Sequence, residues 1–358
     1  NLTGINVYLL IVAMGVIAII YSYTGGLKSV LWTDFIQGCV LIAGIVFSLI
    51  FLISTINGGF GAIMSELTEG GKFLSSQEPI FNANIFKTSV FLLIVGGGLN
   101  TFSSYISSQD IVQRFTTTTD IKQLKKMTYG NLVLSLFVAT VFYLIGTALY
   151  VFYNQNPQLL QTAQQDQIFA SYIAFQLPVG ITGIVLAAIY AAAQSTLSTG
   201  LNSVATSWTL DIQNFITKDM SMEKQTKVAQ YISLGVGIAS IIMAVILANG
   251  GVNSAYEWFN GFMGLVLGVL AGIFVLGIFF KKATKAGAYA GFIASAIAVV
   301  VCKYGGFDVS IWSYSIISIG VSVIVGMIVS LMTQSQLVDK KTLNEATVYY
   351  NESEIANS

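Results

Sequence analysis

Several residue types that carry common protein chemistry are scarce or absent in this sequence. Its 358 residues include no histidine, two cysteines and three prolines. The absence of histidine excludes imidazole acid–base catalysis, histidine-containing nucleophilic triads and ordinary zinc sites. Cys39 and Cys302 each stand alone within an apolar run, which predicts packing roles rather than a disulfide framework or a CxxC site.

Charge is also scarce. Lys, Arg, Asp and Glu together make up 9% of the chain, whereas soluble proteins average about 25%. The net charge of zero gives no electrostatic reason to expect a nucleic-acid partner. No phosphate-binding G-x-x-x-x-G-K-[ST] segment occurs. We therefore expect neither an enzyme nor an ATP-driven pump.

Long apolar runs are abundant, and a helix needs about 20 apolar residues to cross the hydrocarbon of a bilayer. Runs near this length lie at 7–23, 35–54, 85–105, 129–152, 179–199, 228–248, 259–280, 286–302 and 311–332. They are continuously apolar, whereas the strands of a membrane β-barrel alternate. The prediction is an all-α integral membrane protein with nine spanning helices in residues 1–333. The polar residues 334–358 are expected to form a cytoplasmic tail.

The basic residues predict the orientation, because cytoplasmic loops collect Lys and Arg. If the N-terminus is outside, 13 of the 16 basic residues fall in inside segments, and only Lys72, Lys87 and Lys303 fall outside. The segments 55–82 and 153–168 are polar but almost free of cations, as expected of extracellular loops. We expect a multi-pass plasma-membrane protein with its N-terminus outside and its C-terminus in the cytoplasm.

A ladder of polar residues ends the fifth apolar run, where residues 191–203 read A-A-A-Q-S-T-L-S-T-G-L-N-S. On a helix, Ala192, Ser195, Thr196 and Thr199 fall on one stripe, and Ser198 lies beside it. Hydroxyl and carbonyl oxygens suit small hard cations, so one interpretation is a sodium site. The alternative is structural, since Ser and Thr in membrane helices often bond to the carbonyl four residues earlier or join helices. The residues alone leave both interpretations open.

An acid also enters the second apolar run, at Asp34 in the segment L-W-T-D-F-I-Q. An aspartate in the middle of a membrane helix costs about 2.5 to 3.5 kcal/mol, so burial would imply a partner such as a cation. Alternatively, Asp34 lies in the first turn of its helix, where the helix dipole favours a carboxylate by about 0.3 to 1 kcal/mol. These two interpretations also remain open.

The third run contains three consecutive glycines, Gly96 to Gly98, near the middle of its path. Each glycine weakens a helix by about 1 kcal/mol relative to alanine, so we expect a break there. Transporters use such breaks to expose backbone groups to ions and solutes. The alternative is a close crossing of two helices. In the seventh run, Asn260 is a candidate contact for a solute.

Three segments together resemble the sodium/solute symporter family. The segment 19–37, which contains G-G-L and T-D-F-I-Q, is similar to a signature of that family. The segment Q-D-I-V-Q-R at 109–114 resembles the stretch after its broken sixth core helix, and S-T-L-S-T-G-L-N-S at 195–203 resembles its hydroxyl-rich stretch. The resemblance covers residues 7 to 332. It implies a LeuT-type fold of two inverted five-helix repeats with one discontinuous helix.

The resemblance also implies that the chain is an N-terminally truncated fragment. It would hold core helices four to twelve, and the missing N-terminal helices would supply half of the main sodium site and much of the solute pocket.

By the same resemblance, the main sodium site takes the carbonyl of Ala192 and the hydroxyls of Ser195 and Thr196. A second site takes oxygens from Asp34, Ser198 and Thr199, and Ser195 is able to bridge. We therefore expect one or two coupling Na⁺ ions, with two preferred. The candidate solute contacts are Asn100, Thr101, Ser104 and Asn260.

The solute is the least constrained feature. The A-A-A-Q-S-T run is most similar to the bacterial sialic acid symporters, which predicts import of sialic acid by alternating access. Sugar-binding members carry N-L-Y-Y where residues 100–103 read N-T-F-S, which disfavours a hexose. Proline, monocarboxylate, another sugar or a vitamin are the alternatives. A membrane sensor would need a long cytoplasmic domain, and a passive channel would need a continuous polar stripe.

Overall fold

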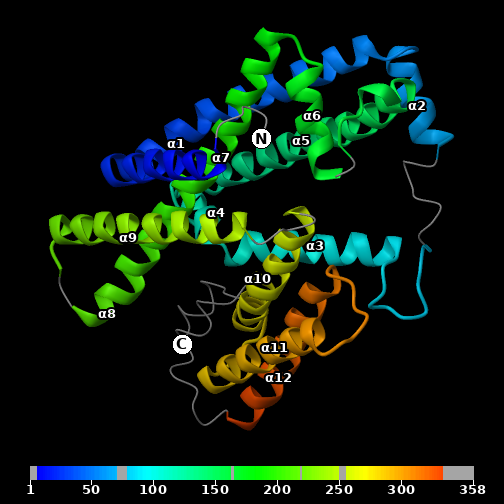
Figure 1. Cartoon of the computed structure of the whole chain (residues 1–358). Helices are drawn as coiled ribbons and strands as arrows, with labels where there is room; N and C mark the ends of the chain where they lie inside the picture. The colour runs from blue at the N-terminus through cyan, green and yellow to red at the C-terminus, as the bar shows by residue number, and fades with distance from the viewer. Residues whose placement is uncertain (1–5, 71–78, 163–164, 218–219, 250–254, 334–358) are drawn as a thin grey trace. The chain divides into compact units, whose positions relative to one another are not determined.

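The computed structural model describes residues 6–70, 79–162, 165–217, 220–249 and 255–333 (Figure 1). Within these residues the secondary structure is entirely helical. Nine stretches are long and apolar enough to cross a membrane, which confirms the predicted number for the described part of the chain. The predicted tail, residues 334–358, lies outside the described residues.

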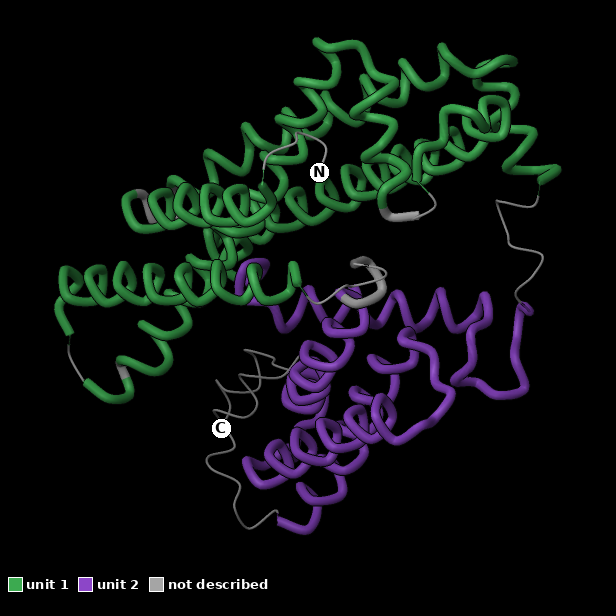
Figure 2. The backbone as a smooth tube through the Cα atoms, in the orientation of Figure 1, with its two compact units in different colours: residues 1–75, 113–253 green, residues 76–112, 254–358 purple. Residues whose placement is uncertain are grey.

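The chain divides into two compact units (Figure 2), residues 1–75 with 113–253 and residues 76–112 with 254–358. The helices of the first unit are α1 (Val7–Thr55), α2 (Gly59–Thr68), α5 (Ile121–Gln155), α6 (Gln165–Phe175), α7 (Val179–Ser207), α8 (Asn214–Ile216) and α9 (Met222–Ala248). Those of the second unit are α3 (Val90–Ser107), α10 (Ala255–Phe279), α11 (Lys285–Tyr304) and α12 (Ser313–Met332). The short helix α4 (Gln109–Phe115) spans the boundary.

Helix α1 contains both of the first two predicted spans, and the chain folds back within it. Ile19 lies at Gly237 beside Leu201 of α7, while Asp34 bonds Thr199, only two residues earlier on α7. In a straight helix Ile19 and Asp34 would be about 22 Å apart, at 1.5 Å per residue. Figure 1 accordingly shows the dark-blue start of α1 and its lighter continuation as two distinct stretches. The two spans therefore form the expected helical hairpin.

The first unit has an aliphatic and aromatic core. Leu52 of α1, Ile63 of α2 and Tyr172 of α6 are fully buried, and Ile145 of α5 is nearly so. The ring of Tyr172 meets that of Phe152 edge-on, with centroids 5.2 Å apart. These contacts hold α1 and α5 together, so that the helix bearing Asp34 has a fixed support.

The second unit is held together by small residues. Helix α12 buries Ser315, Ser318, Ser322, Gly326 and Ser330, which recur every three or four residues. Glycines face this stripe, namely Gly264, Gly268 and Gly272 of α10 and Gly287 and Gly291 of α11. Small residues at these crossings let the backbones approach closely, which is how membrane helices gain packing energy without a hydrophobic driving force.

The break expected at Gly96–Gly98 is not there, because α3 continues through all three glycines. A Cβ atom on Gly96 would overlap the backbone carbonyl of Trp312, so this glycine permits a close crossing of α3 with the start of α12. The discontinuity lies at Ser108, whose extended backbone separates α3 from α4. There the Ser108 hydroxyl donates to the carboxylate of Asp110 in the first turn of α4.

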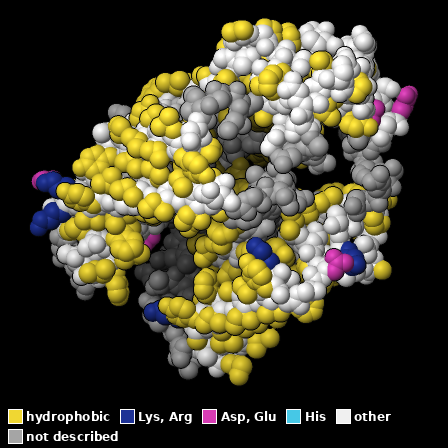
Figure 3. Space-filling model, in the orientation of Figure 1, with side chains coloured by type: hydrophobic (Ala, Val, Ile, Leu, Met, Phe, Trp, Pro, Cys, Tyr) yellow, Lys and Arg dark blue, Asp and Glu magenta, His cyan; other side chains and the backbone are white. Residues whose placement is uncertain are grey.

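The surface is consistent with a lipid environment. Figure 3 shows hydrophobic side chains over much of the visible face, with charged side chains confined to a few small groups. Large apolar residues are exposed on several of the spanning helices, including Leu9, Tyr143 and Ile94. In water such a surface would aggregate, whereas in a bilayer it contacts acyl chains.

Candidate functional site

The hydroxyl ladder lies on α7, whose α-helical backbone is unbroken from Val179 to Ser207. Ser198, Thr199, Asn202 and Ser203 are buried, so the C-terminal half of the ladder faces protein rather than lipid. Continuous helix fixes the spacing of these residues, and the predicted stripe is therefore present.

Asp34 of α1 is the centre of the ladder's contacts. Its Oδ1 accepts a hydrogen bond of 2.6 Å from Ser195 Oγ, and its Oδ2 accepts one of 3.0 Å from Thr199 Oγ1. Its side chain is only 14% exposed. The two helices thus bring together Asp34 and Thr199, two of the three residues assigned to the second sodium site, and add Ser195, which was expected to bridge the two sites. The burial of Asp34 agrees with the interpretation in which the acid needs a partner.

The partner in this structure is a side chain. Arg114 of α4 places Nη2 2.7 Å from Asp34 Oδ2 and donates with the same nitrogen to Thr199 Oγ1 at 3.1 Å. The Arg114 side chain is 41% exposed, so it reaches a mostly buried acid from a wetter position. The cluster of Asp34, Ser195, Thr199 and Arg114, called the Asp34 cluster below, is a nearly neutral group of oxygens around one cation.

Ser198, the remaining residue of the predicted second site, points elsewhere. Its hydroxyl donates to the backbone carbonyl of Ser195 at 3.1 Å, and the residue is 1% exposed. It therefore lies beside the Asp34 cluster without contacting Asp34. This is the backbone bonding typical of serine in membrane helices.

The residues of the predicted main sodium site form a second set of oxygens on α7. Thr196 Oγ1 lies 3.0 Å from the carbonyl oxygen of Ala192 and donates to it. Thr196 is exposed on the described surface, and Ser195 lies next to it, turned toward Asp34. The two sets of oxygens are thus adjacent along one helix.

A second contact of α4 with α7 was not anticipated. Gln113 Nε2 donates to Thr206 Oγ1 at 2.6 Å, and Gln113 Oε1 accepts from Asn202 Nδ2 at 3.3 Å. Neither Gln113 nor Arg114 was a predicted site residue, although both belong to the Q-D-I-V-Q-R segment. One signal was available, because Arg114 is the single arginine among the sixteen basic residues.

Asn202 also lines a cavity. It lines a polar cavity of about 240 Å³ together with Ser22, Thr24, Gln230 and Ser233. Ser233 donates to Ser22 at 2.7 Å across this cavity. Because Asn202 lies one turn after Thr199 on α7, the cavity approaches the Asp34 cluster from the end of α7 predicted to be cytoplasmic.

In the second unit, two predicted solute contacts meet. Asn100 Nδ2 donates to Asn260 Oδ1 at 3.2 Å, and Asn100 Oδ1 accepts from Ser315 Oγ at 3.1 Å. Thr101 and Ser104 both donate to carbonyls four residues earlier, at 3.0 and 3.3 Å. Asn100 is 8% exposed, so it joins α3, α10 and α12, while Thr101 is exposed.

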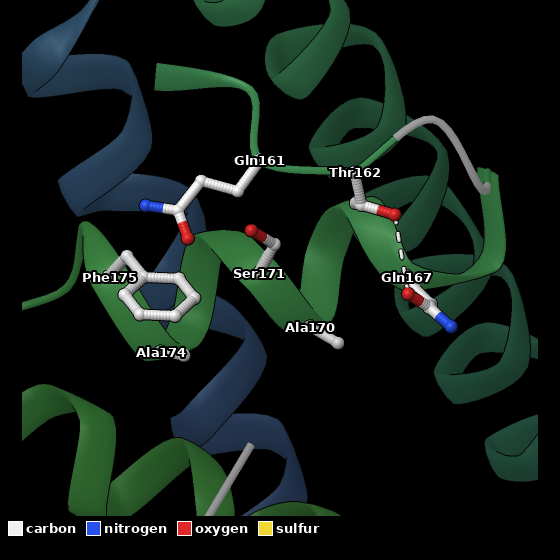
Figure 4. Close-up of a pocket in the computed structure, with 7 residues that line it drawn as sticks. All are labelled: Gln161, Thr162, Gln167, Ala170, Ser171, Ala174 and Phe175. Atoms are coloured by element: carbon white, nitrogen blue, oxygen red, sulfur yellow. Dashed lines mark hydrogen bonds between the residues drawn. The ribbon is translucent and has the colours of Figure 1, made fainter. Parts of the chain in front are cut away.

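A further cavity of about 220 Å³ lies at α6 and the segment before it, in the predicted extracellular loop (Figure 4). Gln161 and Ser171 extend toward each other in it, and Thr162 donates to Gln167 at 3.2 Å. The described residues that line it carry no charge. They offer neutral polar groups to a solute, and none of them is a carboxylate like that of the Asp34 cluster.

Comparison with known proteins shows the family of the chain. The model of the sodium:solute symporter family matches residues 1–295. The sodium/sialic acid symporter SiaT of Proteus mirabilis is 34% identical over 327 residues, covering 91% of this chain and 65% of that protein. The sodium/sialic acid symporter NanT of Aliivibrio fischeri is 30% identical over 334 residues, covering 93% of this chain and 66% of that protein.

A solved structure is also similar. It is described as the substrate-bound outward-open state of a Na⁺-coupled sialic acid symporter with a novel Na⁺ site. The TM-score is 0.83 and the identity 34%, over 92% of this chain and 67% of that one. The expected all-helical, LeuT-type transporter fold is therefore confirmed. The chain spans about two thirds of the length of these relatives.

Proposed function

The chain belongs to the sodium:solute symporter family, and from this premise we propose that the full-length protein imports a small organic solute together with sodium. Sialic acid is the first candidate solute, because two relatives at 34% and 30% identity carry that name. Na⁺ is the coupling ion. The proposed location is the plasma membrane of a bacterium, with the N-terminus of this chain outside and its C-terminus in the cytoplasm.

The observation that carries the proposal is the Asp34 cluster. A carboxylate buried in a membrane helix is costly unless its charge is compensated, so it marks an ion pathway by default. Around Asp34 the chain arranges hydroxyl oxygens from Ser195 and Thr199, at 2.6 and 3.0 Å. Such hard oxygens suit Na⁺ and exclude soft metals. We assign the second sodium site to this cluster, with Ser198 as its neighbour.

The main sodium site is proposed at the adjacent oxygens of α7. The Ala192 carbonyl and the Thr196 hydroxyl already lie 3.0 Å apart on an exposed face of the helix. Ser195 connects the two sites, since it lies between Ala192 and Thr196 in the sequence and donates to Asp34 through its side chain. An ion at either site would therefore change the hydrogen bonding of the other.

Coupling follows from differential affinity. Sodium favours the conformation in which these oxygens are assembled, and the solute favours the same conformation, so each ligand raises the affinity for the other. For the solute we propose contacts at Thr101, Asn260 and Ser104, with Asn100 holding Asn260 in position. The exposure of Thr101 supports its direct role, whereas the burial of Asn100 supports a positioning role.

The test is solute uptake by proteoliposomes containing the full-length protein. Radiolabelled N-acetylneuraminate should accumulate above its external concentration when an inward Na⁺ gradient is present, and accumulation should collapse when a sodium ionophore is added. Proline, glucose and pyruvate supplied in excess identify an alternative solute by competition. Equilibration that ignores the Na⁺ gradient would show a passive channel and contradict the proposal.

A further inference from the structure

The Asp34 cluster contains a cation that belongs to the protein. The Arg114 guanidinium lies 2.7 Å from the carboxylate of Asp34 and 3.1 Å from the hydroxyl of Thr199. These are two of the oxygens assigned to the second sodium site. A nitrogen bonded to both of them takes the position that a metal ion between them would need.

We infer that Arg114 is a tethered counter-cation that competes with Na⁺ for Asp34, so that sodium binds the second site only when the guanidinium leaves it. This inference rests on the proposed second sodium site. It makes Arg114 a positioning and regulatory residue of that site, rather than one of its ligands.

The charge balance supports an exclusive choice. Asp34 supplies the single negative charge of the Asp34 cluster, and one cation is enough to neutralise it. Two cations beside one mostly buried acid would leave a net positive charge in a poorly solvated place, which is costly. A guanidinium does not lose its proton in proteins, so Arg114 cannot make room by becoming neutral. It has to move, and its 41% exposure gives it access to water.

The residue type fits this role. The other fifteen basic residues of the chain are lysines, and the one arginine reaches a carboxylate and a hydroxyl through a single nitrogen, Nη2, of a group that stays charged in proteins. Each alternative cation therefore satisfies the same oxygens, the guanidinium by hydrogen bonds and sodium by coordination. Asp34, Ser195 and Thr199 have partners in both states.

The consequence concerns α4. Among the described residues, its side-chain hydrogen bonds to α7 include Arg114 to Thr199 and Gln113 to Asn202 and Thr206. When sodium displaces Arg114, the Gln113 contacts remain, and one part of the attachment of α4 to α7 is lost. Only Ser108 separates α4 from α3, so α4 connects Arg114 to the end of α3 along the chain.

The first experiment is equilibrium binding of ²²Na⁺ to the purified full-length protein and to Arg114→Gln, which removes the cation and retains a polar side chain. We expect the Na⁺ concentration for half-saturation of the second site to fall at least tenfold. Lys122→Gln, an exposed cation at the start of α5, is the matched control and should bind like wild type. Asp34→Asn should lose one bound ion whether or not Arg114 is present.

The two variants test the competition by Arg114 and the second sodium site separately. Unchanged or weaker sodium binding by Arg114→Gln, with one ion lost in Asp34→Asn, overturns the competition and leaves the second site standing. Full retention of both ions by Asp34→Asn overturns the proposed second site itself.

A second measurement uses the wild-type protein, in case Arg114→Gln does not fold. Phenylglyoxal modifies arginine, and peptide mass spectrometry can follow the single arginine of these 358 residues. Replacing K⁺ by Na⁺ at constant ionic strength should increase the modification rate of Arg114 several-fold, because sodium releases the guanidinium. Slower or unchanged modification in Na⁺ would contradict displacement.

Discussion

Asp34 is a single carboxylate on which two helices and one short segment converge. Because its charge is what attracts a second cation, the isosteric change Asp34→Asn should remove the second sodium and leave the main site. The sodium Hill coefficient of solute uptake by the full-length protein should fall from near two toward one. Uptake measured over a series of Na⁺ concentrations tests this.

The control for Asp34→Asn is Asp308→Asn. Asp308 is also paired with a basic residue, Lys87, at 2.6 Å, but its side chain is 83% exposed. Exposed pairs contribute little, so this change should leave the Hill coefficient unaltered. A coefficient that stays the same in both variants would remove Asp34 from the ion pathway.

Thr196 tests the main sodium site. Thr196→Ala deletes one of its proposed oxygens and should raise the Na⁺ concentration for half-maximal uptake several-fold, because a hard cation loses a ligand. Thr140→Ala is the matched control, since Thr140 is exposed on α5 and donates to the Leu136 carbonyl at 2.7 Å in the same way. Equal sodium dependence in the two variants would count against the main site.

The sequence anticipates part of the Asp34 cluster. Helical spacing places Ser195 and Thr199 on one stripe, and the cost of a buried acid marks Asp34. Arg114 was not predicted as a site residue, and the reason is physical. A cation in a loop between spans is ordinarily explained by the bias of cytoplasmic segments toward Lys and Arg. No pattern in the chain links residue 114 to residues 34 and 199, which only the tertiary fold brings together.

Among the helices, α3 shows how an ambiguous pattern is resolved by packing. Gly96 and Gly98 have the same low helix propensity, but a Cβ at Gly96 would overlap the Trp312 carbonyl, while a Cβ at Gly98 would meet nothing within 4 Å. Gly96→Ala should therefore lower the thermal midpoint of the detergent-solubilised protein, because overpacking costs about 1 to 3 kcal/mol of folding free energy. Gly98→Ala should leave the midpoint unchanged or raise it, because alanine gains up to about 1 kcal/mol in helix propensity over glycine.

Equal midpoints for the two alanine variants would mean that the α3–α12 crossing is not close-packed at Gly96.

The same comparison explains why the predicted break was wrong. Within a membrane an unpaired backbone group costs several kcal/mol, which outweighs the weak propensity penalty of three glycines. The break falls instead at Ser108, whose backbone groups stay paired, because its N–H donates to the Ser104 carbonyl and its carbonyl accepts from the N–H groups of Ile111 and Val112. The same need to pair every backbone group within the membrane makes apolar runs continuous helices, which is why hydropathy predicted the nine spans.

For the transporter as a whole, two sodium ions and one monoanionic solute would carry a net single positive charge inward. Each charge moved down an inside-negative potential contributes about 2.3 kcal/mol per 100 mV. This corresponds to roughly a 50-fold greater accumulation of the solute per 100 mV at equilibrium. A valinomycin-induced K⁺ potential should therefore stimulate sialic acid uptake by proteoliposomes of the full-length wild-type protein.

The Asp34→Asn variant tests whether the second sodium accounts for this response to the membrane potential. With one sodium left, the transported charges cancel, because Na⁺ and the solute anion sum to zero. Uptake by the variant should still require sodium but should no longer respond to the imposed potential. A potential response as large as that of wild type would mean that the second charge crosses the membrane without Asp34. Loss of the response with retained sodium dependence would place the second coupling ion at the carboxylate that Arg114 occupies in this structure.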